Sequence, residues 1–322
     1  MPDHSPAADC TLVSAVIPTR GRPEMLALAV RSALRQTWRF LEVIVVLDGP
    51  DAATEAYLAS VADPRVRGVM LPEPAGGCAA RNTGVRAARG EWIAFLDDDE
   101  MLSPAAIEFL HAARGPDAAD IVSLPLRHFI LGTFDARAYY WPEHQTRFFR
   151  KGTAEFSPTV HGGINLRSER IERIEAESPI FIEHLSHVDT AQWIERTNRY
   201  TSQADRVGVA TEGDSLVDFA HGRIDHWLAR SRDSDGNDYL AAVGLLRAIY
   251  DMVDRIKSWE AQRGLGGAGA FQARCEMLQR AYDELETRIG IPTGMHSRPP
   301  RTGNLLQHLI GCLRRYRRRR NR

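Results

Sequence analysis

The chain has few cysteines, and none of them stand at a spacing that binds zinc or defines a disulfide framework. There are four in 322 residues, and no two form a Cys-x-x-Cys pair. This pattern argues against a zinc site and against a small disulfide-stapled fold. A protein of a reducing, cytoplasmic compartment fits it best. The cysteines are Cys10, Cys78, Cys275 and Cys312.

Long hydrophobic runs are also missing. No stretch is continuously apolar over the length that spans a bilayer, and Met1–Ser5 lacks the basic and apolar regions of a signal peptide. An integral membrane protein is therefore not expected. The hydrophobic content of 43% is still enough to bury a full core, in one large domain or two modest ones.

Acidic residues are absent from Thr287–Arg322, although the whole chain has a net charge of −1. The segment ends in Arg-Arg-Tyr-Arg-Arg-Arg-Arg-Asn-Arg, and leucines and an isoleucine at roughly helical spacing precede this run. Such a tail favours an amphipathic helix on the anionic inner face of a membrane, with a simply solvated tail as the alternative. No nucleic-acid partner is expected, because no aromatic and basic interleaving accompanies the charges.

Short apolar runs alternate with segments of helical spacing through the first hundred residues. This alternation predicts an α/β fold with a mostly parallel central sheet, flanked by helices. Shorter strands and loops are expected over 121–187, and helices over 189–206 and 217–290. The expected strands are 13–17, 41–47, 66–71 and 92–96, and the helices between them are 24–35, 53–61 and 78–88.

One apolar run ends in four acids, Asp97–Glu100. Adjacent carboxylates repel one another, and a divalent cation that also binds an anionic substrate is one common way to keep them ionised. Oxygen ligands without a cysteine or histidine pair point to Mn²⁺ or Mg²⁺ as the cofactor. The alternative is a solvated acidic loop before a helix that begins near Ser103-Pro104.

Polar residues follow two further strands, at Pro18-Thr19-Arg20 and at Asp48. The carboxyl ends of parallel strands meet at one edge of a sheet, so these residues and the acids are expected to line one crevice. There Asp48 is suited to accept a hydrogen bond from a base, and Arg20 and Arg81 are suited to face phosphate. Taken singly, each arginine has the plainer interpretation of a surface ion pair.

These blocks together resemble the family 2 glycosyltransferases, which have the Rossmann-like GT-A fold. The resemblance implies an enzyme, of hexosyltransferase type, that transfers a sugar from a nucleotide-diphosphate donor, most simply a UDP-sugar. The matching segments are Val16–Arg20, Glu42–Gly49, Ala80–Val85 and Ala88–Asp99, in the order and spacing of the family.

The resemblance also implies roles for individual residues. Pro18, Thr19 and Arg20 would border the nucleoside, Asp48 would hold its base, and Arg81 would lie at the phosphate or base side. Asp97 and Asp99 would be the outer members of the family's D-x-D motif, with Asp98 between them. Asp97 would meet the ribose or the sugar, and Asp99 would bind the metal ion, which stabilises the departing diphosphate.

The later chain is similar to a subgroup that includes lipopolysaccharide-core β-glucosyltransferases, through Arg147–Arg150, Val160-His161, Ile182–His184 and Arg196–Tyr200. In that subgroup Glu follows the Val-His pair, whereas Gly162 stands here. An inverting transfer needs a proton acceptor, so His161, Glu183 or Asp189 is expected to replace that Glu as the catalytic base. The alternative is an acceptor acidic enough to need little help, such as a thiol. The resemblance makes His184 a second metal ligand, with packing beside Phe181 as its alternative.

The predicted organisation is an N-terminal tail (1–10), a GT-A catalytic domain (11–206), a helical C-terminal region (207–292), and a linker with the basic amphipathic tail (293–322). The predicted function is a metal-dependent, inverting transfer to a cell-envelope or lipid-linked saccharide. Two alternatives stay open. One is transfer to a peptide or small natural product, and the other is a catalytically degenerate binding module, against which the complete D-x-D argues.

Overall fold

The computed structural model describes residues 11–112, 118–157, 163–202, 215–231, 236–265 and 268–288. The chain divides into two compact units, one of 1–203 with 213–253 and the other of 204–212 with 254–322. The first unit contains the whole central sheet. The second contains the end of a long helix and a further helix.

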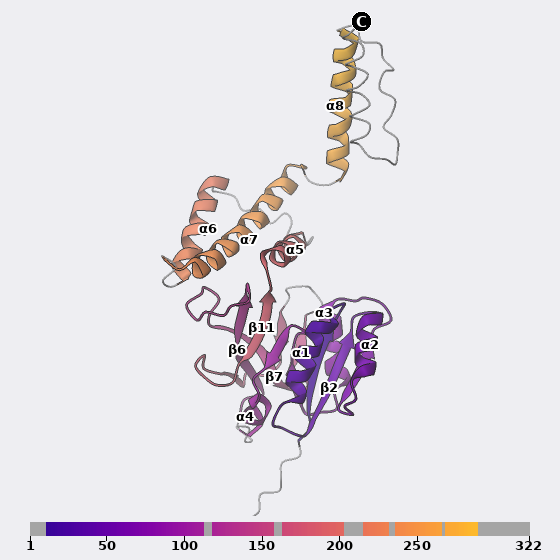
Figure 1. Cartoon of the computed structure of the whole chain (residues 1–322), viewed down its shortest axis with the longest axis vertical. Coiled ribbons are helices and arrows are strands. Elements are labelled where there is room, and N and C mark those ends of the chain that lie inside the picture. Colours follow the sequence, from indigo (N-terminus) through magenta and orange to yellow (C-terminus); the bar gives the residue numbers. More distant parts are fainter. Residues whose placement is uncertain are drawn as a thin grey trace, which may run out of the picture. The chain divides into compact units, whose positions relative to one another are not determined.

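The strands of the first unit form a nine-stranded sheet and a separate two-stranded hairpin (Figure 1). The order in the large sheet is β3-β2-β1-β4-β7-β6-β11-β5, and β10 pairs with β6. The strands are β1 (Val13–Thr19), β2 (Leu41–Leu47), β3 (Val66–Met70), β4 (Trp92–Phe95), β5 (Glu100–Leu102), β6 (Ile121–Ile130), β7 (Glu143–Arg150), β8 (Ala154–Phe156), β9 (Ile164–Leu166), β10 (Ile171–Arg173) and β11 (Ile182–His187).

The first half of the sheet is parallel, as the alternation of strands and helices predicts. Strands β3, β2, β1 and β4 all run in one direction, and antiparallel β7 then joins β4 to β6. The helices are α1 (Pro23–Leu34), α2 (Ala52–Ser60), α3 (Gly77–Ala87), α4 (Ala106–Ala112), α5 (Thr190–Thr201), α6 (Leu216–Arg230), α7 (Asp238–Gln262) and α8 (Ala268–Arg288).

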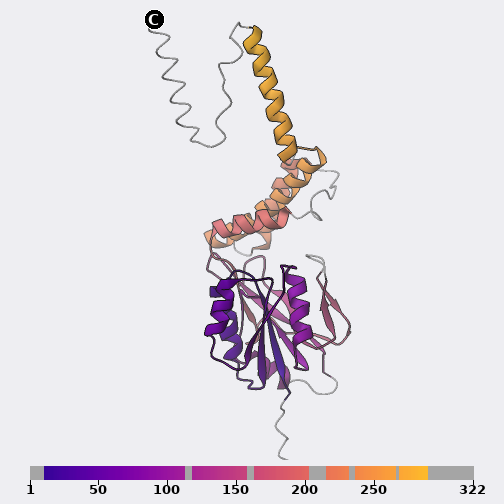
Figure 2. The same cartoon turned by 90° about the vertical axis from the view of Figure 1, so that its right-hand side faces the viewer.

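Helices cover both faces of the sheet (Figure 2). Apolar residues of α1 and α4 pack with one set of alternating strand residues, and α2 adds partly buried residues to the same cluster. The opposite face packs against α3 and the β8–β9 hairpin. The central strands are buried on both faces, which explains why β1 and β2 are mostly apolar rather than alternating. The predicted α/β class is confirmed.

A third apolar cluster lies beyond the end of β6. Ile130 and Tyr140 pack there with Leu240 and Val243 of α7. The hydroxyl groups of Tyr140 and Tyr239 are 2.9 Å apart, in hydrogen-bond contact. This cluster holds the first part of α7 against the sheet. Among the helices that the structure describes, none is long and apolar enough to cross a membrane.

Candidate active site

Asp97, Asp98 and Asp99 lie on the loop between β4 and β5, at the carboxyl end of the parallel strands, and Glu100 begins β5. The N–H of Asp97 donates to Glu100 Oε2 at 3.0 Å, and the N–H of Glu100 donates to the Asp97 carbonyl at 3.0 Å. The tight turn therefore gathers the carboxylates at the strand ends, as the sequence predicts.

Two arginines neutralise the two ends of this cluster. Arg147 of β7 donates to both oxygens of Glu100, at 2.6 and 2.9 Å, and lies 3.1 Å from Asp97. Arg81 of α3 pairs with the other oxygen of Asp97 at 2.7 Å. Burial raises the pKa of Asp97, but Arg147 and Arg81 outweigh burial and hold that pKa below its usual value.

Asp98 is turned into the protein. Its side chain is 1% exposed, accepts a hydrogen bond from the Thr19 hydroxyl at 2.7 Å, and forms an ion pair with Arg22. Burial, which outweighs the nearby Arg22, raises the pKa of Asp98 to about 6. The hydrogen bond between Asp98 and Thr19 thus braces the acidic loop against the end of β1.

Asp99 is shared by residues of three different elements. One oxygen contacts Arg22 at 3.0 Å and Arg196 of α5 at 3.3 Å. The other lies 3.6 Å from His184 Nε2. The four acids thus meet four arginines, Arg22, Arg81, Arg147 and Arg196.

A line of hydrogen bonds continues from His184. Its Nδ1 is 2.8 Å from His128 Nδ1, and His128 Nε2 is 3.1 Å from Glu143 Oε2. The contact with His128 outweighs burial and lowers the pKa of Glu143 to about 2, so its carboxylate only accepts and the hydrogen lies on His128 Nε2.

With neutral imidazoles, that hydrogen fixes both tautomers. His128 Nδ1 becomes the acceptor, His184 Nδ1 carries a hydrogen, and His184 Nε2 is left with a lone pair. Burial lowers the pKa of His184, which favours its neutral form. The lone pair then faces Asp99 Oδ1 at 3.6 Å, and two acceptors at this separation favour a cation between them.

This arrangement fits a divalent ion that is shared with a substrate. Within the described ranges, no group of three or more His, Cys, Asp or Glu side chains forms a complete metal site. Asp99 and His184 supply two ligands, and Mg²⁺ is commonly held by one or two carboxylates together with substrate phosphates. The protein alone therefore does not form a closed metal cage.

Of the residues predicted for the nucleoside side, Asp48 binds the loop before α3. The Asp48 carboxylate accepts from the N–H groups of Ala75 at 2.7 Å and Gly76 at 3.0 Å. Asp48 thereby shapes the loop that leads into α3 and Arg81. Pro18 is buried within β1, and Arg20 is exposed just after it.

A cavity of about 500 Å³ adjoins the acids. Arg81, Asp97 and Glu100 lie on one wall, and His128 and His184 lie on another. Gly163, Ile164 and Tyr200 also line it. Its dimensions and charged lining suit a polar ligand with phosphate groups.

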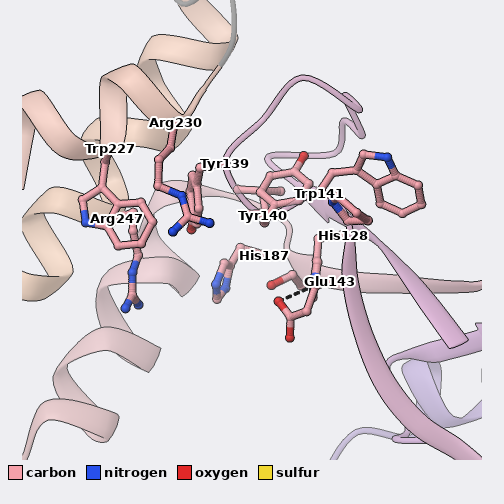
Figure 3. Close-up of a pocket in the computed structure, with 12 residues that line it drawn as sticks. His128, Tyr139, Tyr140, Trp141, Glu143, His187, Trp227, Arg230 and Arg247 are labelled. Carbon is pink, nitrogen blue, oxygen red and sulfur yellow. Dashed lines mark hydrogen bonds and ion pairs between the residues drawn. The ribbon is translucent and has the colours of Figure 1, made fainter. Parts of the chain in front are cut away.

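A second cavity, of about 540 Å³, shares His128 and Glu143 with the first. Figure 3 shows His187 and Glu143 near its centre, and Trp227, Arg230 and Arg247 reaching in from α6 and α7. The two cavities therefore meet at the His128–Glu143 pair.

The three predicted base candidates are not brought together. Glu183 neighbours His184 on β11, and successive strand residues point to opposite faces, so Glu183 lines a separate cavity beside Met101 and Phe181. Asp189 caps α5 by accepting from the Gln192 N–H at 2.8 Å. His161 lies outside the described residues.

Sequence reasoning missed Arg22, His128 and Glu143. Arg147 and Arg196 lie in segments noted for their resemblance, but without a role. Arg22 is 76 positions from Asp98, and Arg196 is 97 positions from Asp99. No local pattern links residues so far apart, and only the pairing of the strands brings them together.

Comparison with known proteins identifies the domain that carries this site. The profile of Glycosyl transferase family 2 matches residues 14–170. Residues 14–170 are thus similar to the family 2 glycosyltransferases. The predicted resemblance to this family is confirmed, and the match includes the acidic loop, Arg81 and Arg147.

Curated relatives of this glycosyltransferase domain include bacterial polysaccharide proteins. The succinoglycan biosynthesis protein ExoO of Rhizobium meliloti is 40% identical over 119 residues, which are 35% of this chain and 34% of ExoO. The uncharacterized glycosyltransferase EpsJ of Bacillus subtilis is 35% identical over 134 residues, 41% of this chain and 38% of EpsJ. The chain thus spans about a third of the length of these relatives.

Among solved structures, residues 1–349 of S. aureus TarS in complex with UDP align with a TM-score of 0.42 and 14% identity. The alignment covers 79% of this chain and 92% of that one. The narrower likeness to lipopolysaccharide-core glucosyltransferases is not tested by these matches and stays a prediction.

Proposed function

We propose that this protein is an inverting, metal-dependent glycosyltransferase that transfers a sugar from a nucleotide-diphosphate donor, with a UDP-sugar as the first choice. The observation that carries the proposal is the approach of Asp99 Oδ1 and His184 Nε2 to 3.6 Å beside the cavity at the acidic loop. The family 2 domain over 14–170 supports it.

In this proposal, Asp99 and His184 hold Mn²⁺ or Mg²⁺ together with the donor diphosphate. When bound, the ion would offset the negative charge that grows on the leaving diphosphate. Arg81 and Arg147 fix the Asp97 carboxylate, which is then positioned for the ribose or the sugar. Asp48 orders the loop at Ala75-Gly76 beside the nucleoside.

We propose a cell-envelope or lipid-linked saccharide as the acceptor. The names of several relatives support this class, since ExoO is a succinoglycan biosynthesis protein and WcaA of Escherichia coli is a putative colanic acid biosynthesis glycosyl transferase. A peptide or small natural product is the alternative acceptor.

His161 is the proposed proton acceptor. It lies two positions before Gly163, which lines the cavity at the acids. Glu183 faces a separate cavity and serves as the matched control. His161→Ala is expected to abolish transfer while nucleotide binding persists, and Glu183→Gln is expected to leave transfer intact.

The test of the function is a panel of UDP-, GDP- and TDP-sugars with manganese, read by thermal shift, calorimetry and release of the free nucleotide. One nucleotide class should raise the melting temperature, because a ligand of the folded state stabilises it. Asp99→Asn and His184→Gln should each lower the release rate at least about 100-fold, the loss typical of removing a main stabilising group. Absence of nucleotide binding in the presence of metal would refute the proposal.

A further inference from the structure

The cavity of about 540 Å³, to which α6 and α7 contribute, is lined by aromatic side chains and arginines. Its lining includes the aromatic side chains of Tyr139, Trp141 and Trp227 and the two guanidinium groups of Arg230 and Arg247. Figure 3 shows both arginines projecting from the helices on the side of Trp227. Aromatic rings beside charged groups are typical of a site for a polar ligand with apolar faces.

The arginines of this wall exceed the acids available to neutralise them. Arg247 contacts Asp251 at 3.3 Å, but Asp251 also pairs with Arg223 at 2.6 Å and accepts from the Trp227 indole at 2.7 Å. Arg230 makes no ion pair with any residue that the structure describes, and its guanidinium lies 5.3 Å from the centre of the Trp227 ring. The wall therefore carries excess positive charge.

The remaining polar groups of the cavity offset this positive charge only in part. Burial, reinforced by Arg196, lowers the pKa of His187 to about 4, so His187 is neutral at physiological pH. The carboxylate of Glu143 is already engaged, by His128 at 3.1 Å and by the Gln145 amide at 2.9 Å. The cavity thus offers an anion two arginines against one ionised carboxylate, that of Glu143 at the boundary with the first cavity.

We propose that this cavity is the acceptor site of the proposed transferase, and that it takes an anionic saccharide whose carboxylate or phosphate group binds Arg230 and Arg247. Guanidinium groups bind both kinds of anion through paired hydrogen bonds. The inference rests on the proposed function for its acceptor role. The shared His128–Glu143 boundary brings the acceptor's end next to the donor cavity.

Binding of defined probes to the full chain tests this site. The probes are a glucuronic acid-containing disaccharide, glucose 1-phosphate and neutral cellobiose, with affinities measured by ligand-observed NMR at constant ionic strength. Comparing the disaccharide, which carries a carboxylate, with glucose 1-phosphate shows which anion the site prefers. We expect at least one anionic probe to bind about tenfold or more tightly than cellobiose, the scale of a charge-assisted hydrogen bond.

Substitutions test whether the preference for anionic probes comes from Arg230. Arg230→Gln should weaken binding of the anionic probe about tenfold, and Arg230→Lys, which keeps the charge, should weaken it less. Arg39→Gln is the control, because Arg39 is exposed just before β2, at the opposite end of the parallel strands from the acids. It should leave binding unchanged.

Equal affinities for anionic and neutral probes would overturn the proposal, as would unchanged binding in Arg230→Gln. Binding of UDP with manganese to the wild-type protein, measured in the same buffers, tests the donor site separately. Loss of the anion preference with intact UDP binding refutes only the acceptor site. Failure of UDP binding refutes the proposed function instead.

Discussion

At the scale of single residues, Glu143 controls the chemistry of a histidine it does not touch. Its carboxylate sets the tautomer of His128, and His128 in turn sets that of His184. Groups that orient a metal ligand in this way typically change metal affinity 10–100-fold when they are removed.

Glu143→Ala is therefore expected to weaken binding of Mn²⁺ in the presence of UDP by roughly 10–100-fold. The measurement is a manganese titration followed by electron paramagnetic resonance, which does not depend on turnover. Glu155→Ala is a suitable control, since Glu155 is exposed on β8 and pairs with Arg167. Equal manganese affinity in wild type and Glu143→Ala would show that the hydrogen-bonded line does not orient His184.

The protonation of His187 makes the free energy of unfolding depend on pH. Its pKa is about 4 in the folded protein, against roughly 6.5 in an unfolded chain. As pH falls from about 6.5 to 4, the unfolded chain takes up the proton first, so the free energy of unfolding decreases. Allowing for partial solvent exposure, the loss is about 2 kcal/mol.

Urea unfolding of the wild type and of His187→Asn at pH 7 and pH 4.5 checks this effect. The variant lacks the titrating group, so its stability should decrease less over the same interval. Identical decreases in the two proteins would mean that His187 is as easily protonated in the folded state as in the unfolded one.

At the scale of elements, α3 packs onto the sheet without room for a side chain at Gly84. A Cβ atom there would overlap Val16 Cγ1 of β1 and lie 2.9 Å from Val46 Cγ2 of β2. This close approach sets the position of the helix that carries Arg81 next to the acidic loop.

Gly84→Ala is expected to lower the free energy of unfolding by about 2–3 kcal/mol, through overpacking. The matched control is Gly222→Ala in α6, where an added Cβ meets no atom within 4 Å. That change should instead stabilise by about 0.5–1 kcal/mol, because alanine favours the helix. Chemical denaturation of both variants measures the difference, and equal effects would contradict the close packing of α3.

Local sequence patterns predict the parallel half of the sheet well. They do not predict the antiparallel half, because its strand pairings join segments far apart in the sequence. Apolar runs followed by turn residues indicate β1, β2 and β4, and the acids after Phe95 locate the site. The insertion of antiparallel β7 beside β4 is a long-range pairing with no local signal. It delivers Arg147 to Glu100, so the neutralisation of the acids was not predictable from their own segment.

At the scale of the whole molecule, the basic segment 293–322 lies outside the described residues, and its membrane role stays a prediction. Deletion of Leu305–Arg322 is expected to abolish sedimentation with anionic phosphatidylserine vesicles, since clustered arginines attract such surfaces. Release of UDP from a UDP-sugar should be unaffected by the deletion. Equal sedimentation of the full chain and the deletion variant would refute the predicted peripheral location at the inner face of the membrane.

The pairing of the acidic loop with four arginines also has a consequence for folding during synthesis, because two of these arginines come much later in the chain than the acids. Arg147 follows Asp97 by 50 positions, and Arg196 follows Asp99 by 97. At ribosomal rates of about 5–20 residues per second, roughly 5–20 s pass between synthesis of Asp99 and of Arg196. Until Arg147 is made, about halfway through that interval, the acidic segment lacks two of its four arginine partners, and until Arg196 is made it lacks one. The set of ion pairs around the acidic loop is therefore completed late in synthesis of the chain, well after the first parallel strands have been made.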